Sequence, residues 1–222
     1  MRTVAIVPMK LNNTRLPQKN IKPFTNGKPL CCYILNTLLK IDEINEVYVY
    51  CSNEGIKKYL PEGVKYLKRS ETLDTDQTKM NEVLKAFADD VNADIYVMTH
   101  TTAPFISAES IKKGITAVAS GMHDSSFSAI KVQDFLWQNG KPFNYELENI
   151  PRTQDLPPLF METSGFYIYQ ASVINDLGRR IGQTPHIVEV NEIEAIDIDE
   201  KEDFEIADAI YNYYYVNGEN DE

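Results

Sequence analysis

Short β-type runs alternate with helical patterns along most of this 222-residue chain, and that alternation constrains the fold more than any other feature. The runs are rich in β-branched and aromatic residues, and the segments between them place apolar residues at helical spacing. We expect strands at 4–7, 47–51, 64–67, 95–98, 125–132, 166–169 and 187–190. We expect helices at 30–39, 54–59, 78–91, 107–120, 171–181 and 202–216. The pattern predicts an α/β fold in which helices cover both faces of a mostly parallel sheet.

The stretch 133–161 breaks this alternation, because its prolines argue against regular elements. The prolines are Pro142, Pro151, Pro157 and Pro158, and the large apolar residues beside them are Phe135, Leu136, Trp137, Phe143 and Tyr145. We therefore expect one domain over residues 1–222 with an inserted arm at 133–161. Apolar groups outside regular elements need a cover, so we predict a homodimer built on the arm. The alternative is that these aromatic side chains fold back onto their own domain.

Composition and charge exclude several classes of protein. No apolar run approaches the roughly 20 residues of a membrane-spanning helix, and the first residues lack a secretion signal. The three cysteines show neither disulfide nor zinc spacing, so we expect a reduced, cytoplasmic protein without a membrane partner. The net charge of −11 argues against nucleic acid as a partner. Residues 189–222 hold thirteen acids and one base, whereas residues 1–41 hold seven bases and no acid, and such a basic start attracts an anion such as a nucleoside triphosphate.

The loop after the first predicted strand is a candidate site for that anion. It carries Lys10, Arg15 and Lys19 among small polar side chains. Ligands of open α/β sheets bind beyond the carboxyl ends of strands, and donor-rich basic loops can wrap a polyphosphate. A basic surface loop without function is the alternative. Neither the dinucleotide-binding glycine pattern nor a P-loop is present, which disfavours a standard Rossmann oxidoreductase and a P-loop kinase.

Two aspartates near the end of the chain are candidate metal ligands. Asp197 and Asp199 lie two apart in a segment expected to be extended, so both carboxylates point to the same side. Magnesium prefers one or two carboxylates together with waters and phosphate oxygens, which this pair would suit. The alternative is that they are two ordinary acids of an acidic tail. The three histidines are scattered and form no competing cluster.

Four segments, in order along nearly the whole chain, resemble the cytidylyltransferases that activate acidic sugars. These are the acylneuraminate (CMP-sialic acid) synthetases and the related CMP-Kdo synthetases. The opening similarity includes Thr14-Arg15-Leu16-Pro17, which is more like the Kdo branch, and Lys19-Asn20, which is more like the sialic-acid branch. The other matching segments are 100–105, 152–158 with 162 and 165–168, and 196–199 with 202–204.

The resemblance implies a Rossmann-like (glycosyltransferase-A-like) nucleotidyltransferase that dimerises through the arm. Its implied reaction transfers CMP from CTP to a sialic acid-like nonulosonic acid and releases pyrophosphate, with magnesium as cofactor at Asp197 and Asp199. The implied catalytic residues are Lys10, Arg15, Lys19 and Asp199. The implied nucleotide-binding residues are Lys10, Asn12, Thr14, Arg15, Lys19, Asn20, Arg69 and Thr78. The implied substrate-binding residues are His100, Arg152, Gln154 and Glu162, with Arg152 on the sugar carboxylate.

Three departures from the family pattern keep other functions open. The loop has no glycine, Lys10 stands where an arginine is common, and His100-Thr101 replaces a Gln-Pro pair. A lysine keeps the charge of an arginine but loses its planar fork. A non-catalytic nucleotide- or sugar-binding relative, and a nucleotidyltransferase for a different small acid or alcohol, are therefore the alternatives.

Overall fold

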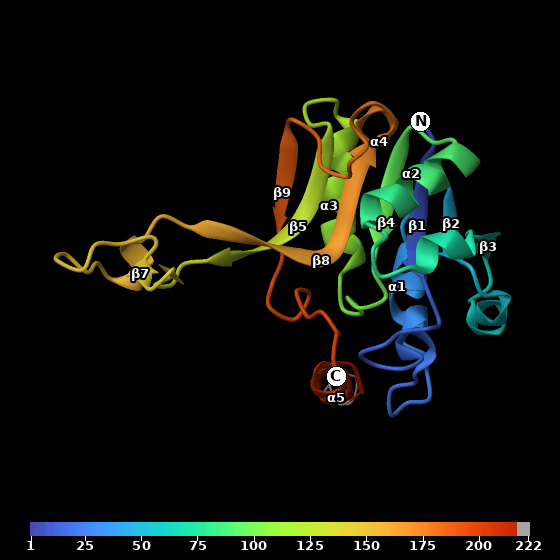
Figure 1. Ribbon diagram of the computed structural model, residues 1–222, viewed down its shortest axis with the longest axis horizontal. Coiled ribbons are helices and arrows are strands. Elements are labelled where there is room, and N and C mark those ends of the chain that lie inside the picture. The colour runs from blue at the N-terminus through green and yellow to red at the C-terminus, as the bar shows by residue number, and fades with distance from the viewer. Residues whose placement is uncertain (217–222) are drawn as a thin grey trace.

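The computed structural model describes residues 1–216 and contains a central seven-stranded sheet (Figure 1). Its strands lie in the order β3-β2-β1-β4-β8-β5-β9. Their bounds are β1 Thr3–Met9, β2 Glu46–Cys51, β3 Val64–Lys68, β4 Ile95–Thr99, β5 Ser125–Val132, β8 Leu159–Gln170 and β9 Pro185–Glu189. The helices are α1 Cys31–Leu38, α2 Met80–Asp90, α3 Ala108–Ala119, α4 Ala171–Leu177 and α5 Lys201–Tyr211.

The predicted mostly parallel α/β sheet is confirmed, with one antiparallel strand. β1 pairs in parallel with β2 and β4, β2 with β3, and β5 with β9. β8 runs antiparallel to both of its neighbours, β4 and β5. The carboxyl ends of the six other strands therefore meet at one edge of the sheet, where ligands of such folds bind.

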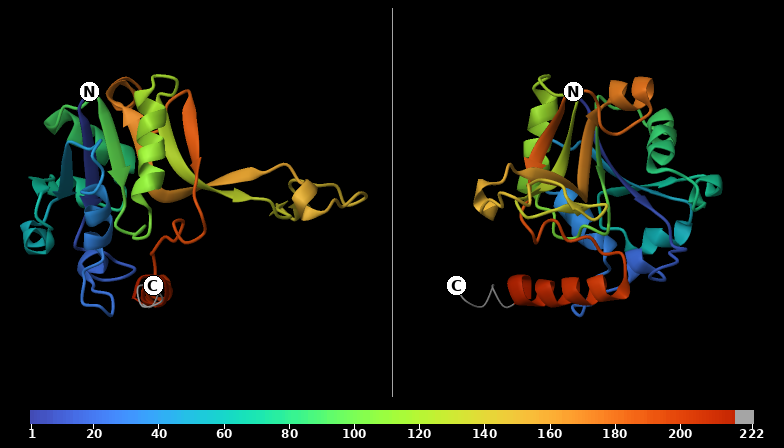
Figure 2. Two further views of the ribbon diagram at one scale, coloured as in Figure 1. Left: turned by 180° about the vertical axis from the view of Figure 1, so that it is seen from behind. Right: turned by 60° about the vertical axis from the view of Figure 1, so that its left-hand side comes forward.

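The alternation of side chains along β1 explains why helices cover both faces. Ala5, Val7 and Met9 pack into a core with α1 and α3, whereas Val4 and Ile6 pack into a second core with α2 and α4. Successive strand side chains point to opposite faces, so a strand that is apolar throughout is covered on both sides. Figure 2 shows α2 and α4 on one side of the sheet and α3 on the other.

A third core lies beyond the carboxyl edge and fixes α5 there. Phe24 packs between Tyr33 and Phe204, with ring centroids 4.9 and 5.0 Å away, and Ile198 is fully buried in the same cluster. The predicted helix 202–216 begins at Lys201 and continues as a π-helix, Asn212–Val216. Residues 197–199 are thereby held between this core and the sheet edge. No helix in the described part of the chain is long and apolar enough to cross a bilayer.

The chain leaves the sheet between β5 and β8 and forms a projecting arm (Figures 1 and 2). The stem is an antiparallel pair running from Ala129↔Glu162 to Val132↔Leu159. The arm also carries a short hairpin of β6 (Trp137–Gln138) and β7 (Lys141–Pro142), and a 3-10 helix, Thr153–Asp155. Residues 159–161, which we assigned to an irregular arm, are thus the start of β8.

Two other element predictions were wrong in extent or type. The helix expected at 171–181 ends at Leu177, because Gly178 takes a left-handed conformation with φ of 64° and stops it. The segment Glu54–Tyr59 is a 3-10 helix rather than an α-helix. Further 3-10 helices span Lys19–Ile21 and Glu71–Asp74.

Candidate functional site

The loops after β1 and β4 enclose a hollow of about 320 Å³ at the carboxyl edge of the sheet. Five predicted site residues line it with charged or donor groups: Lys10, Arg15, Lys19, Arg69 and His100. Asn20 and Thr78 are also in its wall. Residues far apart in sequence therefore meet where the fold places ligands, and the hollow is rich in positive charge.

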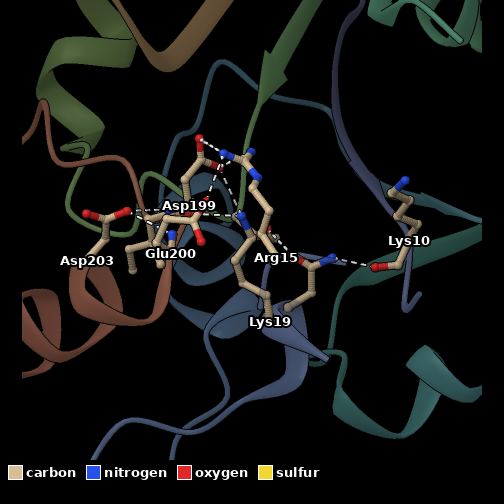
Figure 3. Close-up of polar contacts among 9 residues, drawn as sticks. Lys10, Arg15, Lys19, Asp199, Glu200 and Asp203 are labelled. Carbon is tan, nitrogen blue, oxygen red and sulfur yellow. Dashed lines mark hydrogen bonds and ion pairs between the residues drawn. The ribbon is translucent and has the colours of Figure 1, made fainter. Parts of the chain in front are cut away.

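Arg15 and Lys19 both bind the carboxylate of Asp199 (Figure 3). The guanidinium of Arg15 donates to both carboxylate oxygens, at 2.9 and 2.7 Å. Lys19 is only 7% exposed, and its ammonium donates to Asp199 at 3.2 Å and to the Ile198 carbonyl oxygen at 2.7 Å. Partial burial opposes ionisation of Asp199, but the hydrogen bonds and charges of these two cations outweigh it and lower its pKa. The basic start and the acidic end of the chain thus meet at one carboxylate.

Backbone hydrogen bonds hold the segment that carries this carboxylate. The amide of Ile198 donates to the Thr102 carbonyl oxygen at 2.8 Å. The Asp203 carboxylate accepts from the amides of Asp199 and Glu200 at 3.0 and 2.8 Å. These contacts tie residues 198–200 to the loop after β4 and to the first turn of α5, so Asp199 is placed by two elements.

Asp197 offers an unused ligand atom beside this network. Its Oδ1 is buried and accepts no hydrogen bond within the described residues. A buried carboxylate oxygen without a donor is costly unless a cation satisfies it. The donor set of Asp197 and Asp199 therefore fits a divalent cation. No group of three or more His, Cys, Asp or Glu side chains within the described chain could hold a metal ion.

Lys10 and Asn20 lie on the β1 side of the hollow. The Lys10 ammonium is 3.4 Å from Asp76, and in Figure 3 it lies apart from the Arg15–Asp199 pair. The Asn20 amide donates to the Lys10 carbonyl oxygen at 2.7 Å, and its oxygen accepts from the Thr101 hydroxyl. Asn20 is buried and joins the loop after β1 to the loop after β4. Lys10 thus adds a further cation to the lining of the hollow.

The structure places two loop residues elsewhere and brings in one that sequence reasoning missed. Asn12 and Thr14 are exposed and do not line this hollow; Asn12 faces a separate hollow of about 810 Å³. Asn13 lines the site instead, and its buried Oδ1 has no hydrogen-bond partner within residues 1–216. The loop is irregular, so no periodicity in the sequence indicates which of these three side chains points inward.

Arg69 and Thr78 line the same hollow and come from the segment between β3 and α2. Arg69 is 4% exposed and pairs with Asp74 at 2.5 Å, and its Nε is buried without a partner in the described structure. The Thr78 hydroxyl is 2.8 Å from that of Thr75, which also lines the hollow. A buried guanidinium with an unused donor is suited to read an acceptor atom of a ligand.

His100 lies in the wall next to Asp197. Burial and, to a smaller extent, the positive charge of Arg180 together lower its pKa to about 4, against the opposing charge of Asp197. The imidazole is therefore neutral near pH 7 and offers one donor and one acceptor to a ligand.

The remaining predicted substrate residues lie outside the hollow of their own chain. Arg152 and Gln154 are exposed on the arm, and Arg152 donates to both oxygens of Asp155 at 2.7 and 2.9 Å. Glu162 lies on β8, accepts from the Tyr167 hydroxyl at 2.9 Å, and lines a neighbouring hollow.

Comparison with known proteins identifies relatives of the whole domain. A sequence model of the family described as cytidylyltransferase matches residues 4–216. An N-acylneuraminate cytidylyltransferase of Streptococcus agalactiae serotype V is 24% identical over 179 residues, covering 76% of this chain and 43% of that protein. A Helicobacter pylori protein named pseudaminic acid cytidylyltransferase and UDP-2,4-diacetamido-2,4,6-trideoxy-beta-L-altropyranose hydrolase is 23% identical over 220 residues, covering 94% and 42%.

A solved structure shares the fold. CMP:2-keto-3-deoxy-manno-octonic acid synthetase, solved with CTP, superposes with a TM-score of 0.73 over 96% of this chain and 99% of that one, at 16% identity. This likeness supports the predicted nucleotidyltransferase-type fold. The chain spans less than half the length of the two curated relatives described above.

Proposed function

This chain belongs to the cytidylyltransferase family, and from that premise we propose that it transfers CMP from CTP to an acidic sugar with release of pyrophosphate. One observation carries the proposal: Lys10, Arg15 and Lys19 lie in a single hollow with Asp199 beside them. A cluster of cations opposite carboxylates is what a triphosphate and its divalent ion require. The names of the relatives, which act on N-acylneuraminate and pseudaminic acid, support a nonulosonic acid as the acceptor.

The proposed reaction is an in-line displacement at the α-phosphorus. The sugar hydroxyl forms a bond to that phosphorus, the bond to the bridging oxygen of pyrophosphate breaks, and the hydroxyl proton passes to solvent. Such transfers depend on positioning and on neutralising charge more than on covalent catalysis. Lys10, Arg15 and Lys19 bind the triphosphate and the departing pyrophosphate, and all three line the same hollow.

Asp197 and Asp199 are the residues that would hold magnesium, which offsets phosphate charge when bound. Arg15 is freed from Asp199 when a triphosphate competes for its guanidinium, because that pair is partly exposed and therefore weak. Asp199 then keeps Lys19 as its charge partner. In the free protein, the Arg15–Asp199 ion pair thus neutralises both charges but leaves the triphosphate site open to a ligand.

Arg69 and Thr78 are the proposed contacts to the cytosine. Arg69 is fixed by Asp74 and keeps a buried Nε donor, which suits the O2 or N3 acceptor of the base. We expect CTP to be preferred to UTP, because a site built for the 4-amino group leaves polar atoms unpaired with a 4-oxo base.

The acceptor site is proposed to be completed by a second copy of the chain. Arg152 and Gln154 are exposed on the arm and do not line the hollow of their own chain. The same arm exposes several large apolar side chains, among them Trp137, at 58%. A two-fold dimer through the arms covers these groups and brings Arg152 and Gln154 toward the neighbouring active site.

The experiment is a matrix of CTP, UTP, ATP and GTP against N-acetylneuraminic acid, pseudaminic acid and 2-keto-3-deoxy-manno-octonic acid, with pyrophosphate release as the readout. We expect release only with CTP and one or more of these acids, together with the CMP-sugar by mass. Equal rates with CTP and UTP would discard the cytidylyl assignment. Pyrophosphate release that does not depend on the added acid would contradict the proposal that an acidic sugar is the acceptor. The absence of release in every well would contradict the proposed transferase function.

A further inference from the structure

A second hollow, of about 340 Å³, shares Met80 with the wall of the first one. Its charged lining residues are Lys79, Arg179, Arg180 and Glu162. Three basic side chains against one carboxylate leave an excess of two positive charges. The first turn of α2 also lies in the wall, and the N–H groups of a helix start add partial positive charge. The hollow is therefore suited to an anion.

The arginines of the chain divide into two groups by their partners. Four of the six pair with carboxylates: Arg2, Arg15, Arg69 and Arg152. The other two, Arg179 and Arg180, are adjacent and line the second hollow, and no carboxylate oxygen lies within 4.0 Å of either one in residues 1–216. The guanidinium groups left without an anionic partner are thus gathered at one place.

Arg180 packs against an aromatic ring and has no carboxylate partner in residues 1–216. Its guanidinium carbon lies 3.9 Å from the centroid of the buried Tyr167 ring, which is a cation–π contact. The edge of a guanidinium carries the N–H donors, in a fork that matches a carboxylate. Arg179 is engaged differently, since one terminal nitrogen donates to the Gly182 carbonyl oxygen at 3.3 Å. Arg180 is therefore the better-placed ligand of the two.

The position of Arg180 relative to the first hollow is equally specific. Its positive charge contributes to the lowered pKa of His100, which lines the first hollow together with Lys10, Arg15 and Lys19. Because the second hollow, which Arg180 lines, shares Met80 with the first, Arg180 stands near the proposed triphosphate site.

The chemistry of a 2-keto acid sugar requires a cation near such a site. In the ring form the reacting hydroxyl and the carboxylate are attached to the same carbon, so the carboxylate must lie beside the α-phosphate. Arg152 of the same chain is on the arm, exposed and bound to both oxygens of Asp155. Arg180 meets the requirement without a second chain.

We propose that the second hollow binds the carboxylate of the acceptor sugar, with Arg180 as its anchoring residue and Lys79 as a supporting charge. This inference rests on the proposed function and moves the carboxylate contact from Arg152 to Arg180. The positive charge at this place also reduces the repulsion between the sugar carboxylate and the α-phosphate. Glu162, held by the Tyr167 hydroxyl, is left to accept from sugar hydroxyl or amide groups.

The test compares each acid with its methyl ester in Arg180→Ala, Arg180→Lys, Arg152→Ala and the control Lys40→Ala, an exposed lysine with no anionic partner in residues 1–216. The acids are N-acetylneuraminic acid, pseudaminic acid and 2-keto-3-deoxy-manno-octonic acid. Binding is measured calorimetrically with CMP present, and KM and kcat by pyrophosphate release. For Arg180→Ala we expect Kd and KM of the acid to rise about 10- to 100-fold, as for loss of a charged hydrogen bond, with the KM of CTP nearly unchanged. Arg180→Lys should recover part of the loss.

The ester comparison separates a carboxylate contact from a general disturbance of the hollow. Wild type and Lys40→Ala should prefer acid to ester, and Arg180→Ala should bind both equally. If Arg180→Ala still prefers the acid to its ester, or if Arg152→Ala loses this preference, the inference is wrong. Neither result would contradict the proposed transferase function. Acid that binds through Arg180 without pyrophosphate release supports the inference and contradicts the proposed function. If none of the three acids binds the wild type, the inference is wrong.

Discussion

Asp199 is the residue on which the proposed chemistry depends most directly. Asp199→Asn keeps the shape of the side chain but removes the charge that faces Arg15 and Lys19. We expect kcat for pyrophosphate release to fall by about 100-fold or more, the scale on which a charged ligand contributes to metal-assisted transfer. The chain should still fold, but its thermal stability should fall, because the buried Lys19 ammonium loses the charge of its carboxylate partner.

The matched control for that variant is Glu200→Gln. Glu200 directly follows Asp199 in the chain, and its carboxylate lies 3.6 Å from the Arg15 guanidinium. It caps α5, however, and does not lie on the same side of the segment as Asp197 and Asp199. This control should keep most of its turnover. A wild-type enzyme that retains its rate in excess chelator would contradict the metal assignment.

His100 predicts how stability depends on pH. Its pKa is about 4 in the folded chain and 6.5 ordinarily, so the unfolded chain takes up the proton first as pH falls. The contribution of neutral His100 is fully present above pH 6.5 and is lost as pH falls from 6.5 toward 4. Urea titrations should show a decline in the free energy of unfolding over this window, and a smaller one in His100→Gln. Identical slopes for both proteins would refute the burial of His100 as the cause.

The sequence identified the cations of the first hollow but not those of the second. Lys10, Arg15 and Lys19 fall in one short loop after a strand, where type and position together indicate an anion site. Arg180 follows a helix in a stretch that looks like ordinary surface. Its significance arises only when Lys79 and Glu162, from two other parts of the chain, meet it in space. Local pattern contains no information about that convergence.

At the scale of elements, β8 was the strand least visible in the sequence. Its second half, buried between β4 and β5, reads as a strand, whereas residues 159–162 pair only with β5 in the exposed stem. Periodicity marks a strand when one face is buried, and the stem buries neither face fully. The direction of β8 also could not be predicted, because a return through an irregular arm fits either orientation.

The contact of α3 with β5 and β8 depends on a glycine. A Cβ at Gly114 would lie 2.7 Å from Ile168 Cδ1, 2.8 Å from Ser126 Oγ and 2.9 Å from Phe166 Cε2. Gly114→Val should lower the free energy of unfolding by about 1–3 kcal/mol through overpacking, measured in urea. Ala119→Val, on the exposed side of the same helix, is the control and should cost well under 1 kcal/mol. Equal losses of unfolding free energy in the two variants would show that the helix propensity of valine, and not the close approach of α3 to the sheet, causes the loss.

At the scale of the whole molecule, the uneven distribution of charge helps to hold the N-terminal and C-terminal segments together. The basic start and the acidic end are joined by the Arg15–Asp199 pair and by the Thr25 amide, which donates to Asp208 at 2.9 Å. Lys22 also lies 4.8 Å from the centroid of the Phe204 ring. The acidity of the tail therefore does more than solvate a helix, since part of it fixes α5 against the segment that follows the loop after β1.

The arm is the largest feature that a single chain leaves without a cover. Phe135 and Trp137 pack on Tyr145 within the arm, with ring centroids 4.8 and 6.3 Å away, yet Trp137 remains 58% exposed. We predict that wild type sediments as a dimer at micromolar concentration, because aromatic side chains of this kind dominate interfaces. Phe135→Ala with Trp137→Ala should raise the dimer dissociation constant at least about 30-fold, as for loss of one aromatic hot spot worth 2 kcal/mol.

The activity of that double variant links the assembly to the site. If Arg152 and Gln154 complete the acceptor site of the other subunit, dissociation should raise the KM of the acid more than the KM of CTP, since the first hollow is built within one chain. Met122→Ala, at a more exposed apolar residue on the turn between α3 and β5, is the control and should change neither assembly nor KM. A wild-type monomer with full activity would refute the dimer. A dimer whose dissociation leaves both KM values unchanged would show instead that the arm serves assembly alone.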